Sequence, residues 1–162
     1  RSGRGSAPSP PPRPRHRPER PPVRYLLDTC VVSELTRPRP SSAVAAWLAD
    51  QREEDLYLSV LTLGEIQKGI APLPEGRRKA RLRAWLDHDL RERFAGRIVG
   101  ITEEVALAWG RTSGESAARG RPLPVIDALI AASAAAIDAT VVTRDEAPIR
   151  EAGARTVNPW EQ

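Results

Sequence analysis

The chain has 162 residues, of which 40% are hydrophobic and 28% charged, so its length and composition fit one globular domain with a substantial core. Its formal net charge of +4 is unevenly placed, because residues 1–24 hold seven arginines and one glutamate and the other 138 residues carry a net charge of −2. This distribution excludes a domain that binds nucleic acid by bulk positive charge. The single cysteine, Cys30, excludes an internal disulfide and a cysteine-built zinc cluster.

The same composition predicts the cellular compartment and whether the chain contacts a membrane. No stretch approaches the roughly 18 apolar residues that a membrane helix needs, so we expect no membrane contact. The basic N-terminal segment lacks the apolar core of a secretory signal. Together with the single cysteine, this pattern predicts a reducing, cytoplasmic location.

Residues 1–22 contain eight of the 16 prolines and almost no apolar side chain. Such a segment cannot bury enough surface to offset its chain entropy, so we expect an Arg/Pro-rich extension that is disordered or polyproline-II-like. An arginine arm that touches phosphates is the functional alternative, but the composition favours a dispensable extension. The folded domain is therefore placed at residues 23–162.

Hydrophobic periodicity after residue 22 alternates between strands and helices. Ser41 or Ser42 is the expected N-cap of the first predicted helix, and Thr102 caps a later one. The predicted strands are 23–27, 55–60, 96–101, 139–143 and 154–160, and the predicted helices are 41–50, 62–70, 75–94, 102–120 and 124–137. This alternation favours an α/β fold, an α/β/α sandwich with a central, mostly parallel sheet.

Acidic residues stand at both kinds of element boundary. Asp28 directly follows the first strand, and Asp145 lies three residues beyond Val142. In parallel α/β sheets, sites form at the edge where the strands end, although each of these acids alone is more typical of an ordinary turn.

Two further acids lie near helix starts. Asp127 is the only charge between Pro122 and Ile137, in a helix apolar enough to be largely buried. An unpaired buried carboxylate costs several kcal/mol, whereas the positive helix start returns only about 0.3–1 kcal/mol. Glu65 is the sole acid in its helix, and alone it is more typical of a solvated helical face.

If the four acids converge, each close pair repels by roughly 4 kcal/mol at an effective dielectric near 20. Protonation or a cation relieves that repulsion, and oxygen ligands without histidine or cysteine suit Mg²⁺, with Mn²⁺ as an alternative. Such an ion activates water against a phosphodiester bond. The predicted catalytic and metal-binding residues are Asp28, Glu65, Asp127 and Asp145, and the hydroxyls that can orient them, or simply cap helices, are Thr29, Ser33 and Thr143. Glu34, nearby in sequence, is expected to be solvated.

The ordered segments "YLLDTCVVSELTRPRP", "AVAAWL", "LYLSVLTLGEIQKGIAPLPEGRRKA", "GRPLPVIDALIAASA", "ATVVTRD" and "TVNPWE" resemble the PIN-domain ribonucleases, specifically the VapC toxins of type II toxin–antitoxin systems. The likeness spans about residues 25–161. It implies a PIN-like fold and a Mg²⁺ or Mn²⁺ site in which the family's acids match the four named above. It also implies endonuclease action on structured RNA such as tRNA or rRNA, a homodimer, and inhibition by a cognate VapB-like antitoxin.

Two positions depart from the family pattern. Cys30 stands where members usually have asparagine, and Pro148 stands where many have a later aspartate, with Asp145 at the preceding asparagine position. These departures argue against a second metal ion. They leave open an alternative, a catalytically weakened PIN-fold protein that acts through its partner interface. A nucleotide-binding domain is disfavoured, because no glycine-rich phosphate loop follows the first strand.

RNA can approach an acidic site only when a metal ion is bound there and basic groups flank it. Arg37, Arg39 and Arg144 are the candidates, whereas the basic run at 77–81 is better explained as a solvated helix face. Aromatic residues are few, at 4% of the chain, so recognition by RNA shape and backbone is expected rather than base stacking.

Overall fold

A computed structural model describes residues 22–161, so the extension predicted for residues 1–22 lies, apart from Pro22, outside the described residues. The elements in chain order are β1 (Tyr25–Leu27), α1 (Thr29–Glu34), α2 (Ser42–Ala49), η1 (Glu53–Asp55), β2 (Leu56–Ser59), α3 (Val60–Ile70), α4 (Arg77–Ala84), the π-helical turn η2 (Trp85–Leu90), α5 (Arg91–Arg93), β3 (Ile98–Val99), α6 (Glu103–Ala118), α7 (Val125–Ala136), β4 (Thr140–Val142), α8 (Glu146–Glu151), β5 (Thr156–Val157) and η3 (Pro159–Glu161).

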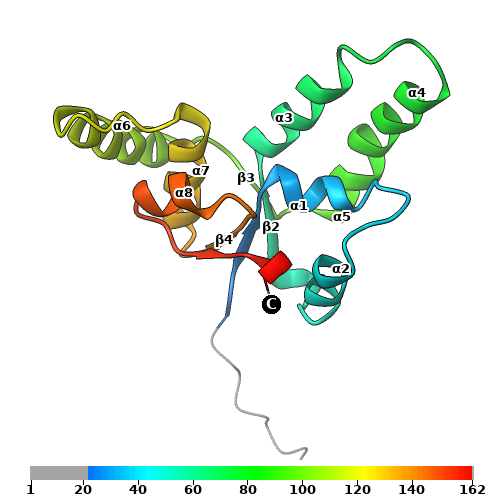
Figure 1. The fold of residues 1–162 in the computed structure, drawn as a ribbon, viewed down its shortest axis with the longest axis horizontal. Helices are drawn as coiled ribbons and strands as arrows, with labels where there is room; N and C mark the ends of the chain where they lie inside the picture. Colours follow the sequence, from blue (N-terminus) through cyan, green and yellow to red (C-terminus); the bar gives the residue numbers. More distant parts are fainter. Residues whose placement is uncertain (1–21, 162) are drawn as a thin grey trace, which may run out of the picture.

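The five short strands form one sheet in the order β3-β2-β1-β4-β5, and every pairing in it is parallel. β1 is central, with Leu27 opposite Leu58 of β2 on one side and Val142 of β4 on the other. All strands therefore end at one edge of the sheet, the carboxyl edge. Helices cover both faces (Figure 1), which confirms the predicted α/β/α arrangement.

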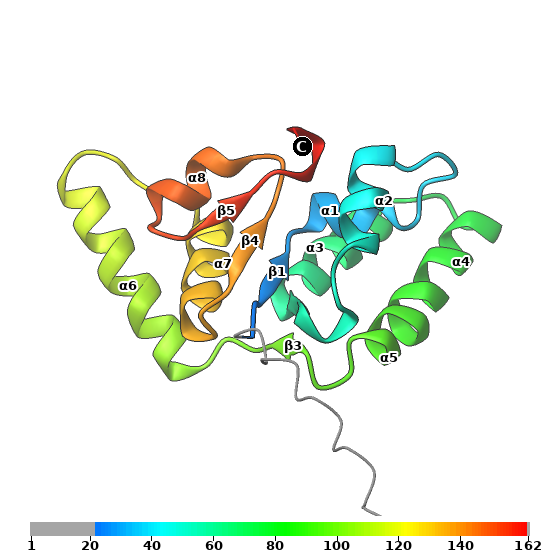
Figure 2. The same cartoon turned by 90° about the horizontal axis from the view of Figure 1, so that it is seen from below.

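The side chains of β1 alternate between two hydrophobic cores, as the two-residue period of a strand requires. Leu27 belongs to a core shared with α1, α2, α3 and η2. Leu26 points to the other face and packs with Ile130 of α7 and Ile149 of α8. Helix α6 packs on the outer side of α7, farther from the sheet (Figure 2).

Several predicted elements appear with altered limits. Ser41 and Thr102 cap α2 and α6 as expected, their hydroxyls accepting the backbone N–H groups of Val44 and Val105. The helix expected over 75–94 begins at Arg77 and contains the π-helical turn η2. Helices α1 and α8 were not predicted, because six residues are too few to show a helical period.

Two expectations about burial are wrong. Glu34 is only 3% exposed, not solvated: its carboxylate accepts the backbone N–H of Ser41 at 2.8 Å and pairs with Arg37 at 2.9 Å. It closes the loop after α1 rather than joining the other acids. Helix α7 is buried in its middle, but its first turn reaches the surface, where Val125 is 56% and Ile126 37% exposed. Within residues 22–161, no helix is both long and apolar enough to cross a membrane.

Candidate active site

Asp28 lies at the carboxyl edge, where β1 ends and α1 begins. Its backbone N–H donates to the carbonyl of Val142 at 3.0 Å, which fixes it between β1 and β4. Its Oδ1 accepts the backbone N–H of Thr29 at 2.8 Å, and its Oδ2 accepts the hydroxyl of Thr143 at 2.7 Å. Both oxygens of this half-buried carboxylate are thus held, one by the first residue of α1 and the other by the residue that follows β4.

Thr143 is fully buried directly after β4. Its hydroxyl donates to Asp28 and accepts the backbone N–H of Asp145 at 3.2 Å. One hydroxyl therefore ties the end of β1 to the loop that carries Asp145. The orienting role of Thr143 stays a prediction.

Glu65 comes from α3, the helix that follows β2. Its Oε2 accepts the hydroxyl of Thr29 at 2.5 Å, and its side chain is half-buried. Thr29 thus holds Asp28 through its backbone and Glu65 through its side chain. Ser33, one turn further along α1, makes no comparable contact with an acid among the described residues, and lines a neighbouring cavity instead.

The pKa of Asp127 indicates that the other three acids lie close enough to interact with it electrostatically. Burial raises the pKa of Asp127 above its ordinary value, and the negative charges of Asp28, Asp145 and Glu65, in that order, raise it further. Asp145 is exposed at the start of α8, and its side chain makes no capping hydrogen bond there. Mutual repulsion of this kind is what a bound cation would relieve.

The donor chemistry fits a hard divalent ion, since the four side chains offer carboxylate oxygens and the adjoining Thr29 and Thr143 offer hydroxyls. Over residues 22–161, however, no three His, Cys, Asp or Glu side chains already stand in a metal-holding cluster. Glu65 is turned to Thr29 and Asp28 to Thr143. The acids are near enough to repel one another, and would have to turn inward to close around an ion.

Cys30 lies inside this neighbourhood, where the sequence had indicated only a departure from the family pattern. Its Sγ is 3.6 Å from Asp28 Oδ2 and 3.7 Å from the hydroxyl oxygen of Thr143, and it accepts the backbone N–H of Arg144 at 3.5 Å. Burial, and then the charge of Asp28, raise the pKa of the Cys30 thiol. The Cys30 thiol is therefore uncharged beside the Asp28 carboxylate, to which it can donate only a weak hydrogen bond. The sequence feature that could have predicted the contact between Cys30 and Asp28 is the position of Cys30 in the first turn of α1, the helix that Asp28 caps.

The predicted RNA-contacting arginines differ in their surroundings. Arg37 is paired with Glu34, and Arg39 is exposed in the loop after α1. The guanidinium of Arg144 lies over the ring of Trp160, 5.1 Å from its centroid. Trp160, in the final turn η3, had not been singled out from the sequence.

A groove runs beside the acids, between α1, α3 and α4. It consists of two cavities of about 260 and 310 Å³ that share Thr36, Leu82 and Trp85. The first cavity also includes Thr29 and Glu65, so the groove extends to one of the four acids. We call it the α3–α4 groove; the residues lining it are Thr29, Ser33, Leu35, Thr36, Glu65, Ile66, Gly69, Ile70, Leu73, Arg78, Arg81, Leu82, Ala84, Trp85 and Asp89.

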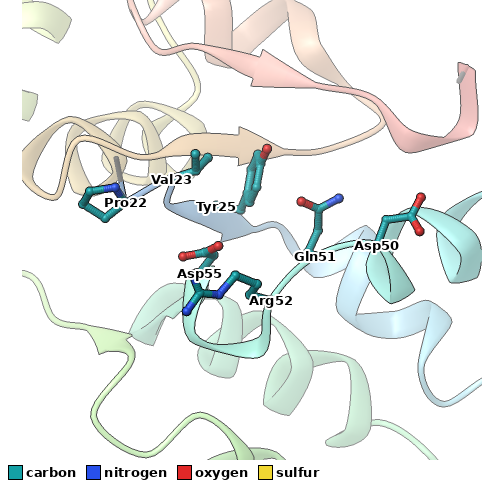
Figure 3. A pocket seen from close by; sticks show the side chains of 7 residues that line it. All are labelled: Pro22, Val23, Tyr25, Asp50, Gln51, Arg52 and Asp55. Atoms are coloured by element: carbon teal, nitrogen blue, oxygen red, sulfur yellow. The ribbon is translucent and has the colours of Figure 1, made fainter. Parts of the chain in front are cut away.

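A separate cavity of about 110 Å³ lies at the opposite edge of the sheet, where β1 and β2 begin (Figure 3). Its lining includes Tyr25, Asp50 and Asp55, and none of the predicted site residues. This edge therefore supplies matched control positions for substitutions at the acids.

The PIN-domain family profile matches residues 25–154 of the chain. Plasmid stability protein StbB of Pseudomonas syringae pv. tomato is 40% identical over 136 residues, which are 84% of this chain and 98% of StbB. Toxin FitB of Neisseria gonorrhoeae is 38% identical over 83% of this chain and 97% of its own length. VapC ribonuclease Y4jK of Sinorhizobium fredii is 35% identical over 84% and 97%, respectively.

Solved structures agree with these sequence relatives. The crystal structure of FitAcB from Neisseria gonorrhoeae superposes with a TM-score of 0.79 at 37% identity, over 85% of this chain and 99% of the matched chain. A structure of FitAB bound to an IR36 DNA fragment gives a TM-score of 0.78 at the same identity, over 84% and 95%. The similarity therefore extends over nearly the whole of each relative.

Proposed function

The chain belongs to the PIN-domain family, as its sequence indicated, and we propose that it is a metal-dependent endoribonuclease that serves as the toxin of a toxin–antitoxin pair. Its substrate would be structured RNA, such as tRNA or rRNA, in the cytoplasm. The geometry that supports this most directly is at the carboxyl edge, where Thr29 contacts both Asp28 and Glu65 and Thr143 contacts both Asp28 and Asp145. The charges of these three acids also raise the pKa of Asp127, in addition to its burial. A relative named VapC ribonuclease supports the same reaction class.

Mg²⁺, or Mn²⁺ in its place, would supply a bound water of lowered pKa and neutralise charge on the phosphate. Asp28, Glu65, Asp127 and Asp145 would hold the ion, and one of these carboxylates would accept the proton of the attacking water. Thr143 keeps Asp28 oriented through its 2.7 Å hydrogen bond, and such outer partners typically change metal affinity or activity about 10–100-fold.

The antitoxin partner is proposed from solved relatives that are complexes named FitAB and VapBC. The α3–α4 groove is suited to an apolar segment of such a partner, because Leu82 and Trp85 line both of its cavities. The groove also includes Glu65, so a segment bound there would cover the acids and block RNA. Leu35 is 38% exposed on its wall, and Leu35→Glu should weaken antitoxin binding without slowing cleavage. A homodimer, implied by the family resemblance, completes the proposal.

The deciding experiment is cleavage of total RNA by the purified chain with Mg²⁺, with Mn²⁺ and with a chelator. Asp28→Asn and Asp127→Asn should each lower the rate by at least about 100-fold, because each removes a metal ligand. Asp50→Asn is the matched control, since this exposed acid lines the cavity at the opposite edge. Equal rates for all three variants would refute the site.

Metal binding can be measured separately from catalysis. An ion that binds only the folded chain raises its free energy of unfolding by about 2.7 kcal/mol at 100 times the dissociation constant, so Mg²⁺ should raise the melting temperature of the parent and not of Asp28→Asn. A parent that takes up Mg²⁺ but leaves RNA intact would favour the catalytically weakened alternative. Cys30 and Pro148 would then be the positions to restore.

A further inference from the structure

The side chain of Arg144, the residue that precedes Asp145, lies over an aromatic ring. Its guanidinium carbon lies 5.1 Å from the ring centroid of Trp160. Figure 2 shows η3, which carries this ring, next to the loop that links β4 to α8. The ring is itself anchored, because the backbone N–H of Trp160 donates to Oδ1 of the buried Asn158 at 3.0 Å.

The backbone of Arg144 is equally constrained. Its N–H donates to the Cys30 thiol at 3.5 Å, and the preceding Thr143 is buried with its hydroxyl on Asp28. The residue that follows is Asp145, whose backbone N–H is held by the same threonine. The backbone of Arg144 is therefore fixed between Thr143, which contacts Asp28, and Asp145.

The charge of Arg144 is not neutralised by a salt bridge. Within residues 22–161, no carboxylate lies within 4.0 Å of its guanidinium. An aromatic face attracts a guanidinium without cancelling its charge, and it leaves the N–H edge available to a second partner. A carboxylate in place of the ring would hold the side chain but would also cancel its attraction for an anion.

We propose that Arg144, held over Trp160, is a phosphate-binding subsite that receives an RNA phosphate neighbouring the scissile one. This deepens the proposed function and rests on it. The guanidinium fork matches two phosphate oxygens, and Trp160 is a positioning residue that holds the fork of Arg144, the residue next to Asp145. Trp160 is half-buried and Arg144 covers one face of its ring, so the ring serves the arginine rather than stacking on a base.

The subsite is tested first by equilibrium binding of total tRNA to an Asp28→Asn background, which separates binding from cleavage. Adding Arg144→Gln should weaken binding about 5–10-fold and reduce the slope of log affinity against log salt by about 0.7–0.9, the loss of one phosphate contact. Adding Trp160→Ala should weaken binding about 2–5-fold with the slope retained, because the charge remains. Trp160→Phe should restore most of the loss, since it keeps an aromatic face.

The matched control is Arg155→Gln, which removes an exposed arginine that pairs with Asp138 at the opposite edge of the sheet. An Arg144→Gln slope equal to that of this control would overturn the subsite, and so would a Trp160→Phe variant as weak as Trp160→Ala. Loss of antitoxin binding with unchanged tRNA binding would also overturn it, by assigning the pair to a protein interface.

Steady-state kinetics on the otherwise unsubstituted chain provide the second arm. Arg144→Gln and Trp160→Ala should raise KM with kcat nearly unchanged, because a neighbouring phosphate is bound equally in the ground and transition states. A fall in kcat at constant KM would contradict the subsite. If the parent does not cleave RNA with Mg²⁺, the proposed function fails, while the tRNA-binding arm still decides whether Arg144 binds phosphate.

Discussion

Replacing Thr143 by valine tests whether one buried hydroxyl holds the candidate site together. Valine keeps the shape of threonine but removes the 2.7 Å hydrogen bond to Asp28 and the acceptor for the N–H of Asp145. A hydrogen bond to a charged group contributes about 1.5–3 kcal/mol, and burying the added methyl returns about 0.8 kcal/mol. The expected net loss is therefore about 1–2 kcal/mol of unfolding free energy. With a urea slope of about 2 kcal/mol/M, the midpoint should fall by about 0.5–1 M.

Controls separate the hydroxyl from the packing. Thr143→Ser keeps the hydrogen bonds and loses one buried methyl group, so its loss should be about 0.5–1.5 kcal/mol with metal affinity unchanged. In a double-mutant cycle with Asp28→Ala, the valine substitution should cost less than in the parent, with a coupling of about 0.5–3 kcal/mol. A coupling of zero would refute the idea that Thr143 acts through Asp28.

Three shorter predictions concern neighbouring residues. Asp127→Asn should stabilise the metal-free chain at pH 7, because burial and nearby carboxylates raise the pKa of Asp127 in the folded state. Protonated Asp127 imposes no such penalty below the ordinary pKa of 3.8, and the parent loses stability relative to the variant as pH rises through the raised pKa. The difference in urea midpoint between parent and variant should therefore vanish in acid. Cys30 should react with iodoacetamide at pH 8 more slowly than a free thiol, because burial and the charge of Asp28 raise its pKa, and Asp28→Asn should speed the labelling measured by mass spectrometry. Glu34→Ala should cost about 1–3 kcal/mol in urea unfolding, since it leaves the N–H of Ser41 unpaired, whereas Glu34→Gln should cost less; equal losses would show that packing alone matters.

The fold was predictable because its main signals are local. The apolar faces of α3 and of the helix over 75–94 repeat at helical spacing, and Leu82, Trp85, Leu86 and Leu90 do contact the first core. Helices α1 and α8 carried no such signal, because they have only six residues each. The strands predicted over 96–101 and 154–160 are present as β3 and β5, but tertiary pairing limits each of them to two residues.

Burial and long-range contacts were less predictable than the elements. Glu34 has the sequence surroundings of a solvated helical acid, and only the return of the chain at Ser41 buries it. The contact of Arg144 with Trp160 likewise joins two residues from separate elements, with nothing local to suggest it. The electrostatic link between Asp127 and the other acids was inferred from type and position, and their use in catalysis remains a prediction for the variants above to decide.

Strand order explains why acids so far apart in sequence meet at one edge. From β1 the chain moves to β2 and β3 on one side, and then crosses to β4 and β5 on the other, so β1 and β4 flank the point where the direction of connection reverses. Helices that follow or precede these strands start at the carboxyl edge from opposite faces, which is the arrangement at which α/β sheets place their ligand sites. Asp28 and Asp145 lie at this edge after the ends of β1 and β4, whereas α3 brings Glu65 from the face of the core around Leu27 and α7 brings Asp127 from the face of the core around Leu26. A sheet in simple sequential order would put both helices on one face, and the four carboxylates would not approach one another from both sides.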